Sequence, residues 1–506
     1  AALDSAAQNA GADRVFLGAA TYTAPAQGFI YDPMNSDDPV EIVGAGTQAT
    51  VLEGTSGAYR TLAVFGGSGT SVHDLGVVMP PNAPDGAQAL RSNGVLRHVS
   101  VYEVVAQQQN VRAGVVLLGS GVLEDGFVGL QDADPTAGVV LLGGGTVRNS
   151  TVYAARGVTT GGGTIDRSYI GASVAGVSIQ HGTTKITSTA IVTSAYGSVG
   201  IVANGDLDGD AFIDVDGVTL AGPDNAQSGT AFEVENTYVP TVKVDAVVKN
   251  TLIRSYPATF WAGGTAPGHG HIDVSYSDYD PSNDHVAGAT GSLSEQHTSY
   301  TGNALFGNEP FVPLPGSPLT DAGDPATGQG LDVDGNPLVT DGDGDGIARR
   351  DIGAFELPAV PLKPSADALP AGGASGAGEQ PPATPPVVPA RDTLAPALSG
   401  LRFNHKVFAV GRAPTAIAAR AASGTRLSYK LSESAKVVVK IRRVGSKRAA
   451  GTLTRRAKSG NSAIAFSGRI GAKALKAGRY RAVITATDAA GNRSPAKSVS
   501  FRIVKR

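Results

Sequence analysis

The sequence predicts an all-β protein of two domains, a parallel β-solenoid followed by a small β-sandwich. The chain has 506 residues, of which 41% are apolar and 17% are charged, with 67 Gly, 30 Pro and no Cys. Few charged residues and many glycines favour turn-rich β-structure over helices. Two further features support the prediction: a short pattern that recurs along the first part of the chain, and a Pro-rich segment that divides the chain in two.

The recurring pattern is a sextet with apolar first and last positions and mostly polar residues at its second and third positions. Repeats of short strands with Gly-rich turns and a unit near 25 residues fit a solenoid, whose coils stack about 4.8 Å apart. A second strand, introduced by Gly-Val at Gly114, Gly138 and Gly176, lies between copies. A β-sandwich is the alternative, but it would not repeat one sextet in register. The copies begin at Val72, Leu96, Leu123, Val147, Ile165, Ile186, Val215, Val248 and Val274.

The second position of the sextet carries charges that alternate in sign through Arg97, Glu124, Arg148 and Asp166. One interpretation is a binding surface for a charged polymer. The other is a ladder of paired charges between neighbouring coils, each pair contributing less than about 1 kcal/mol. We favour the ladder, because charges that pair with each other leave little net field for a ligand.

Both ends of the solenoid have recognisable sequences. Residues 2–12 read as a short helix that would cover the first coil, as a terminal repeat requires. The other end contains Leu314-Pro-Gly-Ser-Pro-Leu-Thr-Asp-Ala-Gly-Asp-Pro325, then Leu331-Asp-Val-Asp-Gly-Asn-Pro337, and an acidic closing loop from Thr340 to Glu356.

These closing motifs resemble a signature of secreted bacterial right-handed parallel β-helix repeat proteins with the pectate-lyase-like fold. The resemblance covers residues 1–356 and implies a right-handed parallel β-helix in a secreted or cell-surface protein. It is specific for architecture and says little about chemistry.

The closing loop is a candidate calcium site. Asp341, Asp343 and Asp345 alternate with glycines, and Asp351 follows. Alternating carboxylates in a Gly-rich loop can surround one Ca²⁺, although the EF-hand pattern fails here because Ile352 stands at loop position 12. Aspartates at 321, 324, 332 and 334 are close enough in sequence to contribute. The alternative is a solvated acidic loop with Asx turns.

A second acidic run offers another calcium candidate. Asp206, Asp208 and Asp210 alternate in the same way, before the copy of the sextet that begins at Val215. We expect both calcium sites to be structural, because a bound cation would hold together a turn that otherwise repels itself.

No complete catalytic set is found. The fragment Gly268-His-Gly-His271 is similar to part of the polygalacturonase-like hydrolase pattern, but the acidic and Arg-Lys parts of that pattern are missing. His269 and His271 could also bind a metal, although a pair of loop histidines is more often simply exposed. Whether the protein is an enzyme stays open.

The two parts of the chain have opposite charge. Residues 1–390 hold 15 Lys/Arg and 41 Asp/Glu, whereas residues 391–506 hold 26 and 3. The Pro/Gly-rich segment 357–390 between them reads as a linker. Residues 391–506 show alternating strands and resemble bacterial immunoglobulin-like or fibronectin-like modules.

The basic domain suggests an anionic partner. No recognised nucleic-acid module is present and aromatic residues are few, so we expect no nucleic-acid partner. An anionic cell-envelope polymer or an acidic polysaccharide is the favoured partner, with the acidic solenoid itself as a further alternative.

The sequence therefore predicts a secreted or cell-surface β-helix protein that is structural or binds carbohydrate. No apolar run reaches the roughly 18 residues of a membrane span. The chain opens with Ala1, as expected of a mature form after signal-peptide removal or of a fragment. The alternative is a polysaccharide lyase or glycoside hydrolase that acts on an acidic polysaccharide.

Overall fold

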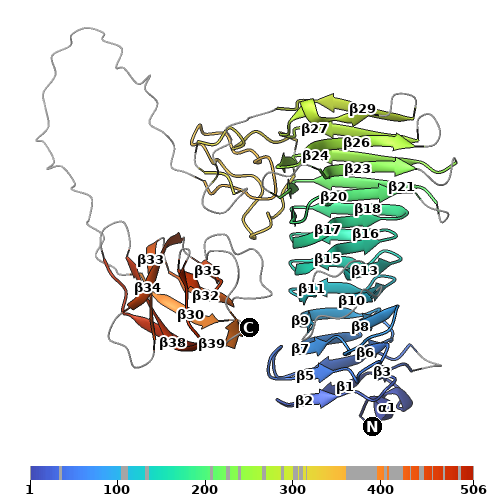
Figure 1. Ribbon diagram of the computed structural model, residues 1–506, viewed down its shortest axis with the longest axis vertical. Coiled ribbons are helices and arrows are strands. Elements are labelled where there is room, and N and C mark those ends of the chain that lie inside the picture. Colours follow the sequence, from blue (N-terminus) through green and yellow to red (C-terminus); the bar gives the residue numbers. More distant parts are fainter. Residues whose placement is uncertain are drawn as a thin grey trace, which may run out of the picture. The chain divides into compact units, whose positions relative to one another are not determined.

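The structure of the protein is a computed structural model, shown in Figure 1. Its contacts divide the chain into two compact units, 1–362 and 363–506. Most of the predicted linker 357–390 lies outside the described residues. The structure describes residues 2–33, 37–103, 112–130, 136–205, 209–223, 228–236, 241–264, 269–286, 290–299, 306, 312–314, 316–326, 328–359, 396–403, 407–409, 425–432, 435–443, 449–457, 460–470, 473–487 and 492–504.

The first unit is a parallel β-helix, which confirms the predicted fold class. Its rungs pile up from α1 to β29 (Figure 1), and each rung contributes strands to three parallel columns. Column 1 consists of β1 (Asp13–Phe16), β4 (Val40–Val43), β7 (Ser71–Val78), β9 (Val95–Tyr102), β11 (Val122–Glu124), β14 (Thr146–Arg148), β16 (Gly163–Asp166), β18 (Gly182–Thr187), β21 (Ala211–Asp216), β24 (Val244–Lys249), β27 (Gly270–Ser275) and β29 (Gly291–Gln296).

Column 2 follows column 1 within each rung, and the long strands β7 and β9 belong to both columns. Column 2 consists of β2 (Thr21–Thr23), β5 (Val51–Glu53), β7, β9, β12 (Phe127–Gly129), β15 (Thr151–Thr160), β17 (Tyr169–Ile179), β19 (Ala190–Thr193), β22 (Thr219–Ala221) and β25 (Leu252–Arg254).

Column 3 completes the rung, and the long strands β15 and β17 join it to column 2. A single 3-10 turn, η1 (Pro281–Asn283), precedes its last strand. Column 3 consists of β3 (Phe29–Tyr31), β6 (Arg60–Val64), β8 (Ala87–Ser92), β10 (Arg112–Leu118), β13 (Ala137–Leu142), β15, β17, β20 (Val199–Asn204), β23 (Thr230–Asn236), β26 (Ala258–Gly264) and β28 (His285–Val286).

The predicted repeat stacks in register. Val101 pairs with Val128, and Val128 pairs with Val152, so the last position of the sextet forms one vertical file. The first position forms a second file, and both files are buried in the same core. Each rung therefore satisfies the strand edges and the apolar face of the rung beside it.

The third position of the sextet makes the corner between columns 1 and 2. In every copy this residue has a positive φ, from 44° at Arg167 to 66° at Gly217. L-residues pay about 1–2 kcal/mol for this left-handed conformation, and Asn, Asp and Gly adopt it most readily. The residues at this position are Asp74, His98, Asp125, Asn149, Arg167, Ser188, Gly217, Asn250 and Tyr276.

A file of glycines lets the rungs approach each other in column 3. A Cβ on Gly157 would lie 2.2 Å from Ile170 Cγ2 and 2.5 Å from the carbonyl oxygen of Gly176. Gly138 and Gly176 face the same conflict with the next rung. The Gly-Val motif of the sequence thus marks positions where neighbouring rungs approach so closely that a residue with a Cβ would clash.

Three of the four charges of the second position pair in the way that the ladder interpretation predicts, while Asp166 has other partners. Arg97 donates to Glu124 at 2.7 Å, and Arg148 donates to the other oxygen of Glu124 at 3.0 Å. Asp166 accepts hydrogen bonds from Arg167 and Thr187. This stripe is compensated internally and does not form a one-sign surface.

Helix α1 (Ala2–Gln8) packs on the first rung, where Ala6 is buried in the core and Leu3 contacts it. The helix ends at Gln8, four residues before the end of the expected segment 2–12. The described residues include no helix long and apolar enough to cross a membrane.

The second unit, taken by itself, consists of two sheets around one core. Residues from both sheets, such as Leu427, Val439 and Phe501, form a single buried cluster. The three-stranded sheet consists of β30 (Leu398–Phe403), β32 (Thr425–Leu431) and β35 (Gly460–Phe466). The five-stranded sheet has the order β31 (Val407–Ala409), β39 (Lys497–Val504), β38 (Gly478–Thr487), β33 (Ala435–Arg443) and β34 (Ala449–Ala457). A small separate pair is formed by β36 (Arg469–Ile470) and β37 (Lys473–Ala474).

Candidate ligand and metal sites

The segment after the last rung, residues 312–359, is called here the closing segment. The sequence places it at the end of the solenoid, whereas the structure packs it along the side of the pile, beside rungs that lie earlier in the chain (Figure 1). It covers the outward file of column 2, formed by Tyr169, Ala190, Thr219 and Leu252. The sequence does not reveal this return, because the contacts join residues more than 100 positions apart.

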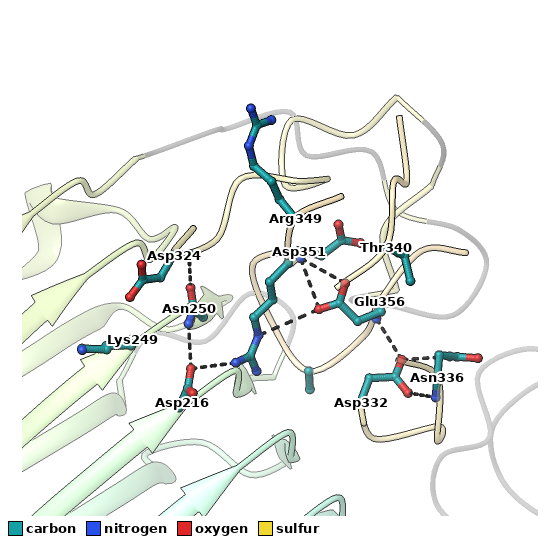
Figure 2. Close-up of polar contacts among 12 residues, drawn as sticks. Asp216, Lys249, Asn250, Asp324, Asp332, Asn336, Thr340, Arg349, Asp351 and Glu356 are labelled. Carbon is teal, nitrogen blue, oxygen red and sulfur yellow. Dashed lines mark hydrogen bonds and ion pairs between the residues drawn. The ribbon is translucent and has the colours of Figure 1, made fainter. Parts of the chain in front are cut away.

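Two neighbouring rungs provide the main polar anchor for the closing segment. Asp216 accepts hydrogen bonds from Arg350 at 2.9 Å and from Asn250 at 2.7 Å. The side-chain oxygen of Asn250 accepts the backbone N–H of Asp324 at 2.6 Å. Figure 2 shows Asp216, Asn250 and Asp324 in a line that joins the rungs to the closing segment.

Gly217 makes the space that Arg350 occupies. Arg350 is 1% exposed, and a Cβ on Gly217 would lie 1.5 Å from its Nη2. Of the nine residues at the third position of the sextet, Gly217 is the one without a side chain. The exception to the repeat is thus explained by a residue 133 positions later in the chain.

Buried carboxyl groups lie behind this anchor. Asp351 accepts the backbone N–H of Asp321 at 2.8 Å and that of Leu357 at 2.7 Å, while its own N–H donates to Glu356. Burial, with the nearby Asp321 and Asp332, raises the pKa of Asp351 to about 7. Burial and the charge of Asp351 raise the pKa of Glu356 to about 9, so Glu356 carries a proton at neutral pH.

Three carboxylates converge as a candidate cation site. Ligand oxygens of Asp321, Asp341 and Asp343 lie within 4.8 Å of one another. Asp321 is buried and held by the backbone N–H groups of Gly342 and Asp343 at 3.0 and 2.9 Å. Such a set of hard oxygen ligands suits Ca²⁺. The same aspartates also accept backbone N–H groups in Asx turns, as the alternative interpretation predicts.

The predicted ligands thus divide. Asp341 and Asp343 meet, joined by Asp321, which the sequence offered only as a possible contributor. Asp345 instead accepts the N–H of Ile347 and pairs with Arg349 at 3.5 Å, and Asp351 is engaged as described above.

The second predicted cation site cannot be placed in the same way. Asp206 and Asp208 lie outside the described residues, and Asp210 accepts the backbone N–H of Lys243 at 2.8 Å. Of the two histidines, His271 pairs with Asp273 at 3.1 Å and contacts Ser292.

A groove lies on the outward face of column 3, away from the closing segment. Its volume is about 560 Å³, and residues from β8, β10, β13, β15, β17 and β20 line it. Its floor follows the outward file of Val116, Val140, Thr159, Ser178 and Val202. The groove therefore crosses successive rungs and suits an extended ligand.

Polar groups surround this apolar floor, and Arg112 is the most unusual of them. Its side chain is 0% exposed and donates to the equally buried Glu103 at 2.6 Å. Its Nε and Nη2 are buried without an acceptor among the described residues. Buried donors without acceptors are costly, and a ligand or water that accepts from them removes that cost.

An acid pair follows the groove on the next rung. Glu233 pairs with Val202 and Glu235 with Asn204, so both carboxyl groups lie on the outward face. Burial, a side-chain hydrogen bond with Glu235 and the charge of Glu235 raise the pKa of Glu233 to about 7. Trp261, which is 38% exposed, stands beside Glu233 on the following rung.

Sequence reasoning did not identify the groove or the acid pair. The available signal was two glutamates at alternate positions of a strand, Phe232-Glu-Val-Glu235, which place both on one face. Arg112 offered no signal, because burial and missing acceptors appear only when the rungs are stacked.

Comparisons with known proteins include one similar solved structure. No protein-family model matches the chain, and no curated protein matches it. Among solved structures, the A-module of the mannuronan C-5 epimerase AlgE4 from Azotobacter vinelandii is similar, with 15% identity and a TM-score of 0.35. The match covers 59% of this chain and 94% of that one.

Replacing Gly217 with Ala should displace Arg350 and loosen the closing segment. The free energy of unfolding should fall by about 3–5 kcal/mol, since the buried Arg350 is separated from its partly exposed partner Asp216, in addition to backbone strain of about 1 kcal/mol. Gly57→Ala is the control, because its φ of 75° is similar and nothing lies within 4 Å. Denaturant unfolding measures both. Equal losses in the two variants would refute the role of Arg350.

Proposed function

We propose that the protein is an extracellular or cell-surface β-helix protein that binds an acidic polysaccharide in the groove of column 3. Arg112 is the observation that carries the proposal. The groove would have to open at the fully buried Arg112 side chain, so that a uronate carboxylate could accept from the two guanidinium N–H groups that have no acceptor among the described residues. Charge-assisted bonds of this kind are the stronger ones. The apolar floor would take the faces of the sugar rings, as in most carbohydrate-sized pockets.

Calcium belongs to the same proposal as a structural ion. Asp321, Asp341 and Asp343 would hold it, and it would offset their mutual repulsion where the closing segment folds back on itself. The basic second unit would attach the protein to an anionic polymer of the envelope or to the polysaccharide itself. An immunoglobulin-like or fibronectin-like topology for this unit is part of the proposal.

Arg112→Lys should weaken binding of a short uronate oligosaccharide about tenfold or more. Lysine keeps the charge beside Glu103 but loses the forked donors that a carboxylate can engage. Calorimetric titration at high salt measures the affinity, with Arg14→Lys as a control at the exposed pair with Glu41. A variant that folds like the parent and binds equally well would overturn the role of Arg112.

Calcium should raise the stability of the parent protein and of Asp345→Asn, but not that of Asp343→Asn. A cation at 100 times its Kd adds about 2.7 kcal/mol to the folded state. The two aspartates are close in sequence, yet only Asp343 lies in the converging set. Thermal melting in calcium and in chelator measures the difference. The same melting temperature of the parent in both solutions would contradict the site.

The acid pair favours a second candidate function, a polysaccharide lyase. Two carboxyl groups joined by a hydrogen bond are closer than the roughly 5 Å or more that the usual two-carboxylate hydrolases need, so Glu233 and Glu235 do not fit that mechanism. A carboxyl group whose pKa is near 7 is suited to proton transfer at neutral pH.

Incubation with uronate polymers, with and without Ca²⁺, distinguishes the two candidates. Binding alone predicts no unsaturated products from either the parent or Glu233→Gln. Unsaturated sugars from the parent, and at least a hundredfold less from Glu233→Gln, would establish the lyase and displace the binding-only function.

A further inference from the structure

The five-stranded sheet of the second unit presents an outward face of unusual charge. Along β33 and β38, inward residues such as Val439 and Ile484 are buried, while the basic residues on the opposite face are exposed. The basic residues of this face, called here the basic face, are Lys436, Lys440, Arg442, Arg479, Arg481 and Arg502.

The strand register places arginines directly opposite each other on the basic face. Arg442 pairs with Arg481 between β33 and β38, and Arg479 pairs with Arg502 between β38 and β39. Residues opposite each other in antiparallel strands have Cβ atoms about 5 Å apart, and like charges there are destabilising. The sheet therefore accepts a repulsion that its fold does not require.

No acidic side chain relieves this repulsion in the described part of the second unit. The acidic residues of 391–506 are Asp392, Glu433 and Asp488, and all three lie outside the described residues. The first unit treats its charges differently, because Arg97 and Arg148 share Glu124 on neighbouring rungs. The basic face is complementary to an external chain of anions.

We propose that the basic face binds a linear polysaccharide whose anions are carboxylates. Outward side chains repeat about every 6.7 Å along a strand and about every 4.8 Å between strands, so a flexible chain of anions can meet several cations at once. Arginine forks suit carboxylates, and among the side chains that the structure describes on this face no aromatic one is exposed to stack a nucleobase. The choice of a carboxylate polymer rests on the function proposed for the groove.

The test uses the full chain and polygalacturonate at salt concentrations from about 50 to 500 mM, a range over which exposed charges become screened. The triple variant Arg442→Gln, Arg481→Gln, Arg502→Gln should bind at least about tenfold more weakly at low salt. Its affinity should also depend less on salt, because fewer counterions are exchanged on binding. Its melting temperature should stay the same or rise, since the repulsion between arginines is removed.

The matched control changes the net charge equally elsewhere in the same unit. Lys430→Gln, Lys473→Gln, Lys476→Gln removes three exposed cations away from the basic face and should keep the affinity within about twofold. Equal losses in the two triple variants would overturn the basic face as the site. Binding of inorganic polyphosphate or duplex DNA in place of polygalacturonate would overturn the choice of partner.

The proposal for the groove and the proposal for the basic face can be refuted independently. A short uronate oligosaccharide at high salt reports on the groove, whereas salt-dependent binding of the long polymer reports on the basic face. Arg112→Lys should change only the first measurement and the arginine triple variant only the second. Loss of the second measurement in Arg112→Lys would overturn the basic face as an independent site.

Discussion

The left-handed corner at the third position of the sextet is the constraint on which the rest of the first unit depends. Each rung turns from column 1 to column 2 at one residue with positive φ, and the same turn occurs in every copy. Because the corner is repeated, the apolar residues on both sides of it fall into vertical files. The cost of about 1–2 kcal/mol for each non-glycine corner is offset by the burial that these files allow. The closing segment depends on the same geometry, because Gly217 at one corner leaves the space that Arg350 fills.

The two units handle charge in opposite ways. In the first, carboxylates and cations meet on neighbouring rungs, or lie buried together behind Arg350, where Glu356 stays protonated at neutral pH. Exposed pairs of this kind contribute little stability and compensate each other only locally, because residues 1–390 hold 41 Asp/Glu and 15 Lys/Arg. In the second, the described part of the unit opposes arginine to arginine on an exposed sheet. The two units therefore differ in where their charges lie relative to one another, as well as in the numbers of acidic and basic residues.

The fold could be predicted from the sequence because a repeat makes each residue predict the position of its counterpart one rung away. The vertical file of Val101, Val128 and Val152 and the pairing of Arg97 with Glu124 follow from that property. The side-on return of the closing segment could not be predicted, because no periodicity links Arg350 to Asp216. The burial of Arg112 could not be predicted for a related reason, since it arises only when the rungs are stacked, and the same holds for the burial that raises the pKa of Glu233.

Cross-linking tests the stacking of rungs most directly, and the absence of native cysteines leaves no background. Thr146 pairs with Thr164 on the next rung, and directly paired residues lie within the Cα separation of about 4.4–6.8 Å that a disulfide bridges. Thr146→Cys with Thr164→Cys should oxidise fully to one intramolecular disulfide. Thr146→Cys with Asp166→Cys, two residues out of register and about 8 Å away, should not. Equal cross-linking in the two variants, or cross-linking only in the second, would contradict the in-register pile.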